Sequence, residues 1–294
     1  EPILSEKDLN APILRDSDVN FSIKVLVTGV KGQLGYDVVK RLNELGIEAI
    51  GVDKDDFDIT NKEQTHEYIL KTMPDVVVHC AAYTAVDKAE TEKGACYAIN
   101  VEGTRHIAEA CKMIDAKMVY ISTDYVFDGE GNEPQYEDKI TNPKNYYGYT
   151  KEQGEQIVRQ ISEKHFIVRT SWVYGENGNN FIKTMLKLAQ TKKEINVVED
   201  QIGAPTYTVD LAKLICDMLQ TTKYGTYHGV NEGYCSWYEF AIEIFKTKGI
   251  NIKVNPIPSS EYPTMAKRPM NSRLSKSNLD KNGFTKLPHW RNAL

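Results

Sequence analysis

The sequence predicts an α/β protein with a doubly wound parallel sheet, followed by a smaller lobe of mixed α/β structure. Short apolar runs rich in β-branched residues alternate with amphipathic segments from residue 23 to about residue 171. The run at Pro74–Ala82 is almost continuously apolar, which is typical of parallel strands buried on both faces. Beyond residue 171 the strict alternation ends, so the second part of the chain is predicted to have a different architecture.

The first strand and helix enclose a glycine-rich turn. A strand predicted at Ile23–Thr28 leads into Gly29, Gly32 and Gly35, and an amphipathic helix over Tyr36–Leu45 follows. Glycines let the backbone turn tightly and approach a pyrophosphate, while free N–H groups at the start of the helix bind its oxygens. This order of elements indicates a Rossmann dinucleotide-binding fold. The alternative is a tight turn that binds nothing.

The second strand ends in an acid that suits a ribose. The strand predicted at Ile47–Asp53 places Asp53 about 20 residues beyond the glycine loop, where an acid binds the adenosine ribose hydroxyls. Asp53 favours NAD over NADP, although Lys54 beside it would tolerate a 2′-phosphate. Asp58 is expected either to contact the adenine or to cap the helix predicted over Asn61–Thr72.

The third and fourth strands end in side chains that suit a cleft. Pro74–Ala82 ends in Ala81 and Ala82, which leave room for a cofactor at the carboxyl edge of a parallel sheet. Lys117–Thr123 ends in two hydroxyl side chains, the second of them Thr123. The polar loop from residue 124 to residue 142 is long for a simple connection, which favours a loop that faces the substrate.

Between these strands a long helix is predicted over Glu92–Lys112, with the polar Asn100 among apolar neighbours. The Asn100 amide is expected either to face solvent or to bind a neighbouring loop. We favour the second reading because of those apolar neighbours.

Tyr147 and Lys151 lie four residues apart in a segment that we expect to be helical, which puts both side chains on one face. An ammonium near a phenol favours the phenolate and makes the tyrosine a better proton donor or acceptor near neutrality. Tyr36 and Lys40 have the same spacing, but they belong to the helix after the glycine loop. Only the second pair follows the strand that ends in hydroxyl side chains, so acid–base chemistry is predicted there.

The chain is therefore divided into three parts. Residues 1–22 are expected to be an extension outside the fold, or an arm that packs on it; residues 23–171 form the dinucleotide-binding domain; residues 172–294 form mainly the substrate-binding lobe, with some chain crossing back to the sheet. The fifth strand is predicted at His165–Trp172. The later elements are predicted at Asn180–Thr191, Val209–Gln220 and Ser236–Lys248 (helices), Ile195–Val198 (strand) and Pro256–Pro269 (proline-rich loops).

Composition narrows the class of protein. The net charge of −5 gives no basic surface for nucleic acid, and no apolar run is long enough for a membrane span. The five cysteines form no C-x-x-C pair, which favours reduced thiols in a cytoplasmic protein and excludes a zinc site built of cysteines.

Several longer motifs resemble those of the extended short-chain dehydrogenase/reductases and, within them, the dTDP-4-dehydrorhamnose reductase family. The glycine loop and the Tyr147/Lys151 pair match the larger group. The finer resemblance, which spans roughly residues 23–290, is carried by the segments at residues 84–90 (TAVDKAE), 122–129 (STDYVFDG), 169–175 (RTSWVYG), 179–181 (NNF), 200–206 (DQIGAPT) and 268–274 (RPMNSRL).

This resemblance implies the reduction of dTDP-4-dehydro-β-L-rhamnose at C4 by NADPH or NADH. It implies that Tyr147 donates the proton, that Lys151 binds the nicotinamide ribose and tunes Tyr147, and that Thr123 binds the keto oxygen. The implied cofactor contacts also include Gly29, Gly32, Gln33, Leu34, Gly35, Asp53, Asp58, Ile59, Ala81, Ala82, Tyr83 and Thr84. The implied substrate contacts are Val86, Thr123, Asp124, Tyr125, Trp172 and Arg268.

The same resemblance leaves some points open. Relatives often have His where this chain has Tyr83. Trp172 is expected at the substrate or in plain core, and Thr123 could serve only as a strand-end cap. Some relatives hold Mg²⁺ at a dimer contact, which makes a homodimer an expectation and gives Asp37 and Glu199 as candidate ligands.

Two other functions compete with this one. The first is a nucleotide-sugar epimerase or dehydratase of the same superfamily; dehydratases carry a Glu as base in a Thr-Asp-Glu run, where this chain has Tyr125. The second is a non-catalytic, NADP-binding regulatory subunit like the β subunit of methionine adenosyltransferase. The presence of Thr123, Tyr147 and Lys151 together argues against a subunit without catalysis.

Overall fold

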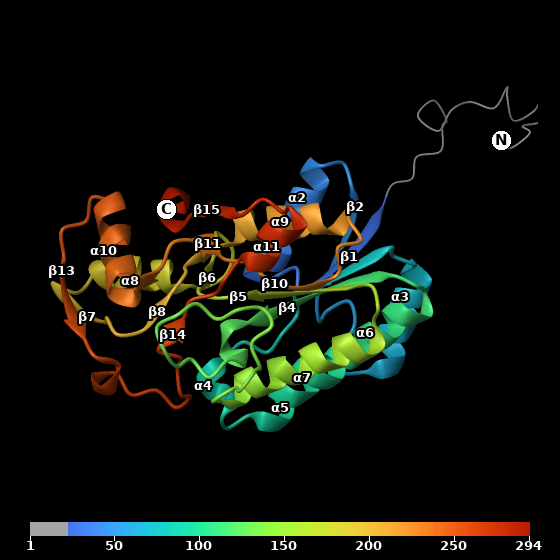
Figure 1. Cartoon of the computed structure of the whole chain (residues 1–294), viewed down its shortest axis with the longest axis horizontal. Coiled ribbons are helices and arrows are strands. Elements are labelled where there is room, and N and C mark those ends of the chain that lie inside the picture. Colours follow the sequence, from blue (N-terminus) through green and yellow to red (C-terminus); the bar gives the residue numbers. More distant parts are fainter. Residues whose placement is uncertain (1–22) are drawn as a thin grey trace, which may run out of the picture.

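A computed structural model describes residues 23–294, so the extension predicted at residues 1–22 lies outside the described residues. Six parallel strands form the central sheet (Figure 1). In spatial order they are β2 (Glu48–Val52), β1 (Lys24–Thr28), β3 (Val76–His79), β4 (Lys117–Thr123), β5 (His165–Thr170) and β10 (Gly225–His228). The strand order reverses between β1 and β3, where doubly wound sheets bind their ligands. The predicted fold class is confirmed.

Helices cover both faces of this sheet (Figure 1). One face packs against α2 (Gln33–Glu44) and α9 (Thr208–Leu219), and the other against α3 (Lys62–Thr72), α6 (Thr104–Met113) and α7 (Tyr146–Ile161). Alternate residues of one strand point to opposite faces of the sheet and pack into the hydrophobic cores on those two faces. Val25 and Val27 of β1 face α2 and α9, whereas Leu26 between them faces the opposite layer. All three side chains are fully buried.

Elements from beyond residue 172 also belong to the sheet layers. Strand β10 pairs with β5, and α9 packs on α2 and supplies Leu211, Ile215 and other buried side chains to the core. The division at residue 172 into two lobes stays a prediction, but the chain does return to the sheet.

The predicted helix over Glu92–Lys112 is three consecutive segments: α5 (Lys93–Tyr97), a π-helical stretch (Ala98–Gly103) and α6. Asn100 is buried in the π-helical stretch. Its amide oxygen accepts from the Tyr83 N–H at 2.8 Å, and its amide nitrogen donates to the Tyr83 carbonyl at 3.1 Å and to Thr150 Oγ1 at 3.0 Å. The reading that this amide binds a neighbouring loop is confirmed, and the solvated alternative is wrong. The short helix α4 (Val86–Ala89) precedes these segments.

Two predicted strands end earlier than expected. The third ends at His79 and the fifth at Thr170, rather than at Ala82 and Trp172. Trp172 has a φ of +49°, in the left-handed region that no strand residue adopts, so the chain turns out of the sheet before it.

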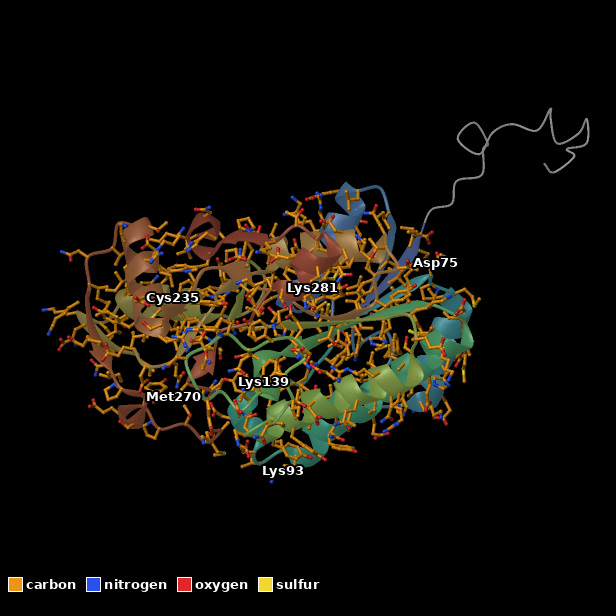
Figure 2. The ribbon with its side chains drawn as sticks, viewed as in Figure 1. Asp75, Lys93, Lys139, Cys235, Met270 and Lys281 are labelled. Carbon is orange, nitrogen blue, oxygen red and sulfur yellow. The ribbon has the colours of Figure 1, made fainter. Side chains whose placement is uncertain are left out.

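The C-terminal lobe is built around α8 (Phe181–Ala189), α10 (Trp237–Thr247) and the strand pair β7 (Glu194–Val198) and β13 (Lys253–Ile257). Strand β13 includes Pro256, so the predicted proline-rich loop is wrong at its start. Cys235 lies inside this lobe (Figure 2). Ser236 caps α10 reciprocally with Glu239, which explains why the helix begins at Trp237.

Short elements complete the described part of the chain. They are β6 (Val173–Tyr174), β8 (Ile202–Gly203), β9 (Thr206–Tyr207), β11 (Asn231–Glu232), β12 (Cys235–Ser236), β14 (Asn271–Ser272), β15 (Leu287–His289) and α11 (Ser277–Asn282), with 3₁₀ turns at Asp124–Val126, Ser259–Glu261 and Trp290–Ala293. Within residues 23–294, no helix has the length and apolar character needed to cross a membrane.

Candidate active site

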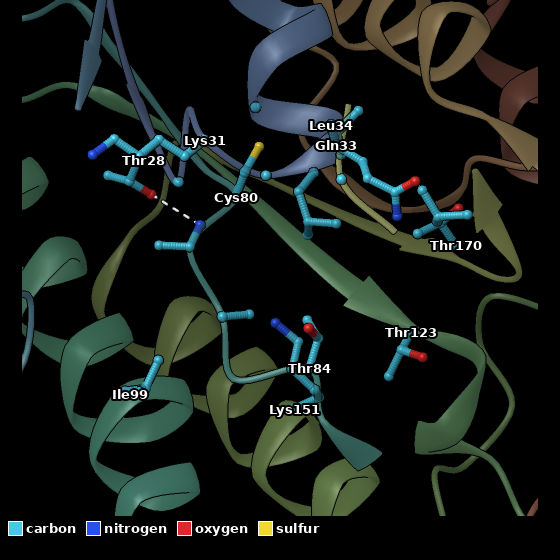
Figure 3. Close-up of a pocket in the computed structure, with 18 of the residues that line it drawn as sticks. Thr28, Lys31, Gln33, Leu34, Cys80, Thr84, Ile99, Thr123, Lys151 and Thr170 are labelled. Carbon is cyan, nitrogen blue, oxygen red and sulfur yellow. Dashed lines mark hydrogen bonds between the residues drawn. The ribbon is translucent and has the colours of Figure 1, made fainter. Parts of the chain in front are cut away.

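A cavity of about 790 Å³ lies at the carboxyl edge of the sheet, against the first residues of the lobe. Thr28 and Lys31 lie toward one side of it, and Thr123 and Thr170 toward another (Figure 3). Most of the predicted site residues line it: Gly29, Gly32, Gln33, Leu34, Gly35, Asp53, Asp58, Ile59, Ala81, Ala82, Thr84, Val86, Thr123, Asp124, Tyr125, Tyr147, Lys151 and Trp172. Tyr83 and Arg268 do not.

The glycine loop fits a dinucleotide pyrophosphate. Gly29 has a φ of +71°, and a Cβ there would lie 2.7 Å from the Ala81 backbone nitrogen. A Cβ on Gly35 would overlap the Gly29 carbonyl. Helix α2 begins at Gln33 without any side-chain cap, so its first N–H groups face the cavity edge unbound by a capping side chain. This cradle has the shape and the donors that phosphate groups need.

The adenosine end of the cavity is rich in exposed charge. Asp53 accepts the backbone N–H of Lys31 at 3.0 Å and that of Lys54 at 2.9 Å. The Lys31 ammonium pairs with Asp55. Both lysines line the cavity beside Asp53, so positive and negative groups lie together where a ribose or a 2′-phosphate would bind.

Asp58 lines the cavity but does not cap a helix. Its carboxylate accepts the N–H and hydroxyl of Thr60 at 2.9 and 2.8 Å. Asn61 caps α3 instead, because its side chain accepts the Gln64 N–H at 3.0 Å. The cap reading of Asp58 is therefore wrong, and its adenine contact stays a prediction.

Tyr83 turns away from the cavity. Its hydroxyl donates to Glu92 at 2.6 Å, and its backbone is held by Asn100. Gln33, by contrast, reaches across to the lobe, where its side-chain oxygen accepts from the Gly175 N–H at 3.1 Å and from Asn180 at 3.0 Å. A cofactor contact of the Tyr83 side chain has no support in this geometry.

The reacting end gathers Tyr147, Lys151 and Thr123. Helix α7 carries the first two and begins at Tyr146, because the Asn145 side chain accepts the Gly148 N–H at 2.8 Å. Lys151 is 3% exposed, and its ammonium lies 4.2 Å from the centre of the Tyr120 ring. The competing Tyr36 is 45% exposed and lies outside the cavity.

Burial controls the charges of this pair. Burial lowers the pKa of Lys151 to about 7 and raises the pKa of Tyr147, and the nearby Asp124 carboxylate raises the Tyr147 pKa further. The expected lowering of the Tyr147 pKa by Lys151 is therefore wrong. The reason is desolvation, which disfavours the charged form of both groups in the same enclosed space.

Asp124 orders the hydroxyls around Tyr147. It accepts a hydrogen bond from Thr123 Oγ1 at 2.9 Å and another from the hydroxyl of Ser272. Thr123 also accepts the Tyr125 N–H at 3.3 Å and caps the 3₁₀ turn that follows β4. Burial raises the pKa of Asp124 to about 6, so its charge changes just below neutral pH.

Aromatic and ionic contacts frame the substrate side. Trp172 stacks on Trp237 with their ring centres 3.6 Å apart, so it belongs both to the cavity wall and to the lobe core. Arg268 donates to Asp87 at 2.6 Å and to the Tyr125 hydroxyl at 3.1 Å. Tyr125 in turn meets the Tyr147 ring edge-on, with their centres 5.6 Å apart. Arg268 therefore reaches the cavity through Tyr125.

Sequence reasoning did not single out several residues that line the cavity. Thr28 is one of them, and its hydroxyl accepts the Ala81 N–H at 3.1 Å (Figure 3). Its position directly before the glycine loop is the feature of the sequence that could have identified it. Ser171, Gly178 and Asn179 line the cavity through the fold of the lobe. The Asn179–Phe181 motif contributes to the family resemblance, but its residue types and spacing predict no role in the cavity.

The two candidate metal ligands do not form a site. Asp37 is buried and accepts a hydrogen bond from Thr208, and Glu199 is exposed. No group of three or more His, Cys, Asp or Glu side chains able to hold a metal occurs within residues 23–294. The structure gives the expected magnesium no support.

Comparisons with known proteins identify the family. The family model described as the RmlD substrate binding domain matches residues 23–294. The dTDP-4-dehydrorhamnose reductase of Aggregatibacter actinomycetemcomitans is 40% identical over 92% of this chain and 97% of its own length. The spore coat polysaccharide biosynthesis protein SpsK of Bacillus subtilis is 42% identical over 92% of this chain and 95% of its own.

Solved structures point to the same family and fold. The dTDP-4-dehydrorhamnose reductase of Bacillus anthracis, in complex with NADP, superimposes with a TM-score of 0.90 at 44% identity, over 92% of this chain and 96% of that one. A UDP-glucose 4-epimerase of Thermus thermophilus shares the fold, with a TM-score of 0.77 at 20% identity over 90% of this chain and 94% of its own. The chain therefore belongs to the RmlD substrate binding domain family, the family of the dTDP-4-dehydrorhamnose reductases.

Proposed function

We propose that this protein reduces the C4 ketone of dTDP-4-dehydro-β-L-rhamnose to give dTDP-L-rhamnose. The observation that carries the proposal is one cavity that joins a pyrophosphate cradle to Tyr147, Lys151 and Thr123. The family relatives that bear this activity in their names, and the relative bound to NADP, support the same reading.

A reduced nicotinamide, when bound, supplies the hydride for this reaction. In the proposal, Tyr147 gives its proton to the C4 oxygen while negative charge grows there. Thr123 offers a second hydrogen bond to that oxygen when its proton turns from Asp124 to the substrate. Lys151 holds the nicotinamide ribose and, while charged, stabilises the phenolate that Tyr147 becomes.

Tyr125 favours reduction over elimination. Dehydratases of this superfamily place a Glu base where this chain has Tyr125, whose hydroxyl is engaged by Arg268 and whose pKa burial raises to about 12. A phenol with that pKa is a poor base near neutral pH. The cavity therefore contains a proton donor for the ketone, but no carboxylate base at this position.

The adenosine end supports the use of both cofactors. Asp53 suits the ribose hydroxyls of NADH, and Lys31 and Lys54 offer cations to the 2′-phosphate of NADPH. The NAD preference predicted from the sequence rests on Asp53 and Lys54, whereas the cavity also includes Lys31. We therefore propose that both NADH and NADPH donate the hydride. The charged residues at the adenosine end would determine which of the two is used more efficiently.

Turnover of the purified protein tests the function. Oxidation of NADPH or NADH is followed with dTDP-4-dehydrorhamnose, and Tyr147→Phe is compared with Tyr36→Phe. Tyr36 has the same spacing to a lysine but is exposed on α2, so its variant keeps full turnover. We expect Tyr147→Phe to lose about 100- to 10,000-fold in kcat, because the proton donor is removed.

The same assay separates the alternatives. Product isomerised or dehydrated without net cofactor oxidation would identify an epimerase or dehydratase. Cofactor binding without turnover on any dTDP-sugar would favour a regulatory subunit. Either result would replace the proposal.

The cell compartment and the assembly are also proposals. The five free cysteines, four of them buried, suit a reducing cytoplasm. A homodimer is suggested by the family resemblance, and light scattering of the purified protein measures it directly.

A further inference from the structure

Glu155 is a fully buried carboxylate on α7, one helical turn beyond Lys151. It accepts four hydrogen bonds. Arg169 donates two of them, from Nε at 2.8 Å and from a terminal nitrogen at 2.7 Å. Ser122 Oγ donates at 2.6 Å and Arg159 at 2.8 Å. Such a carboxylate stays ionised, and its pKa is held below the usual range by Arg169 despite burial.

These donors tie the catalytic helix to the two strands beneath it. Ser122 is the residue before Thr123 at the end of β4, and Arg169 lies in β5 beside Thr170. Arg169 is 2% exposed and also donates to the Glu137 carbonyl at 3.1 Å. Any shift of Glu155 would therefore move α7 relative to the strand end that carries Thr123.

Among residues 23–294, Glu155 is the acid whose charge favours the Lys151 ammonium, whereas Asp124, the other carboxylate at this end of the cavity, acts on Tyr147. The imidazole, thiols and phenols around Lys151 are neutral. His79 has its pKa lowered to about 3 by burial, Cys80 has its pKa raised to about 12, and burial also raises the pKa values of Cys96, Tyr120 and Tyr147. Burial disfavours the charged ammonium, and the Glu155 carboxylate opposes that effect.

We propose that Glu155 is a positioning residue that keeps Lys151 charged and fixes the catalytic helix against the end of β4. Its role for turnover rests on the proposed function, whereas its effect on Lys151 does not. Because the Lys151 ammonium sits close to its own titration at neutral pH, a modest change in the local field decides how much of it is charged.

Three charge changes on α7 test this. Glu155→Gln keeps the size of the side chain and one of its two acceptor oxygens but removes the charge, so the pH above which NADPH binding and kcat/KM decline should fall by about one unit. Arg159→Gln removes a cation next to Glu155, so the same pH should rise. The Arg159 side chain is 39% exposed, which makes this variant tolerable to the fold.

Glu152→Gln is the matched control. It removes the same charge from the same helix, one residue after Lys151, but its carboxylate bonds to Gln153, Gln156 and Thr141. The pH profile should stay where it is in the parent protein. Circular dichroism and thermal melting report whether each variant folds.

The outcomes are distinct. If Glu155→Gln folds and weakens binding and turnover equally at every pH, Glu155 is only structural and the proposal is overturned. If Glu155→Gln does not fold, Arg159→Gln decides: an unchanged or lowered pH overturns the proposal. Because NADPH binding is followed by its own fluorescence without substrate, the shift remains measurable if no dTDP-sugar is reduced.

Discussion

The two ends of the cavity differ in the kind of group that lines them and in how deeply these groups are buried. At the pyrophosphate and adenosine end, the groups available for binding are the backbone of the glycine loop, the exposed lysines Lys31 and Lys54, and the half-buried Asp53. At the reacting end, Lys151 and Asp124 are buried and their pKa values are shifted by desolvation. We therefore expect substitutions at the first end to alter cofactor binding through steric fit and direct contacts, with little dependence on pH. Substitutions at the second end should change how activity and stability depend on pH.

Gly35→Ala should have the largest effect of the following changes, and it acts at the backbone-built end. Its Cβ would overlap the Gly29 carbonyl, so the loop must move away from the position that accepts phosphates. We expect a loss of about 1–3 kcal/mol in stability and of most NADPH binding. Calorimetry and fluorescence titration measure the two losses.

Gly94→Ala is the control for that change. Gly94 is also helical, but a Cβ there meets nothing within 4 Å. We expect NADPH binding to be unchanged in Gly94→Ala. If Gly35→Ala also binds NADPH as well as the parent protein, the close packing of Gly35 against Gly29 is not needed for cofactor binding.

Asp124→Asn tests the buried end, with stability and activity changing in opposite directions. The pKa of Asp124 rises from 3.8 to about 6 on burial, so as pH rises the unfolded chain ionises first and the folded state loses up to about 3 kcal/mol. The loss begins near pH 4 and is complete above pH 6. The neutral asparagine avoids it.

We therefore expect Asp124→Asn to gain stability at pH 8 and almost none at pH 4, while turnover falls because Thr123 is no longer ordered by a carboxylate. Chemical denaturation at the two pH values and steady-state kinetics measure this. An equal stability change at both pH values would mean that packing, rather than ionisation, dominates this end.

Lys54→Ala should have the smallest effect. Lys54 is exposed beside Asp53, and surface charges contribute about 0.2–1 kcal/mol. We expect the KM for NADPH to rise a few-fold, the KM for NADH to stay unchanged, and the difference to shrink in high salt. The measurement is the ratio of the KM values for NADPH and NADH at low and at high salt. An effect of Lys54→Ala that changes with pH would contradict the expected difference between the two ends of the cavity.

The same contrast explains what the sequence could predict. The glycine loop and the Tyr147/Lys151 pair depend on local spacing, which is visible in the chain. The ionisation of Lys151 and Asp124 depends on neighbours from distant segments, such as Ser272 at Asp124, so the predicted direction of the Tyr147 pKa was wrong. Asp58 and Asn61 are equally good candidates for the cap of α3 in the sequence, because both residue types favour that position. Asn61 is the residue that caps the helix in the structure.

Errors in the fold have a similar origin. Strand β10 was not predicted because Gly225–His228 is only four residues long and shows no clear alternation; pairing with β5 makes it a strand. The predicted fifth strand ran too far because nothing in the Ser171-Trp172 sequence announces the left-handed backbone of Trp172. Both features are decided by tertiary contacts rather than by local preference.

Strand β10 also has a consequence for how the chain reaches its folded state during synthesis. The sheet cannot be completed until the ribosome has released residue 228, and α9, which covers α2 and one face of the sheet, emerges only shortly before. Until then β5 presents an unpaired edge of backbone groups, and the apolar side chains beneath α9 are bare. A nascent chain in that state can pair with a second copy, so protection by chaperones matters most over this interval.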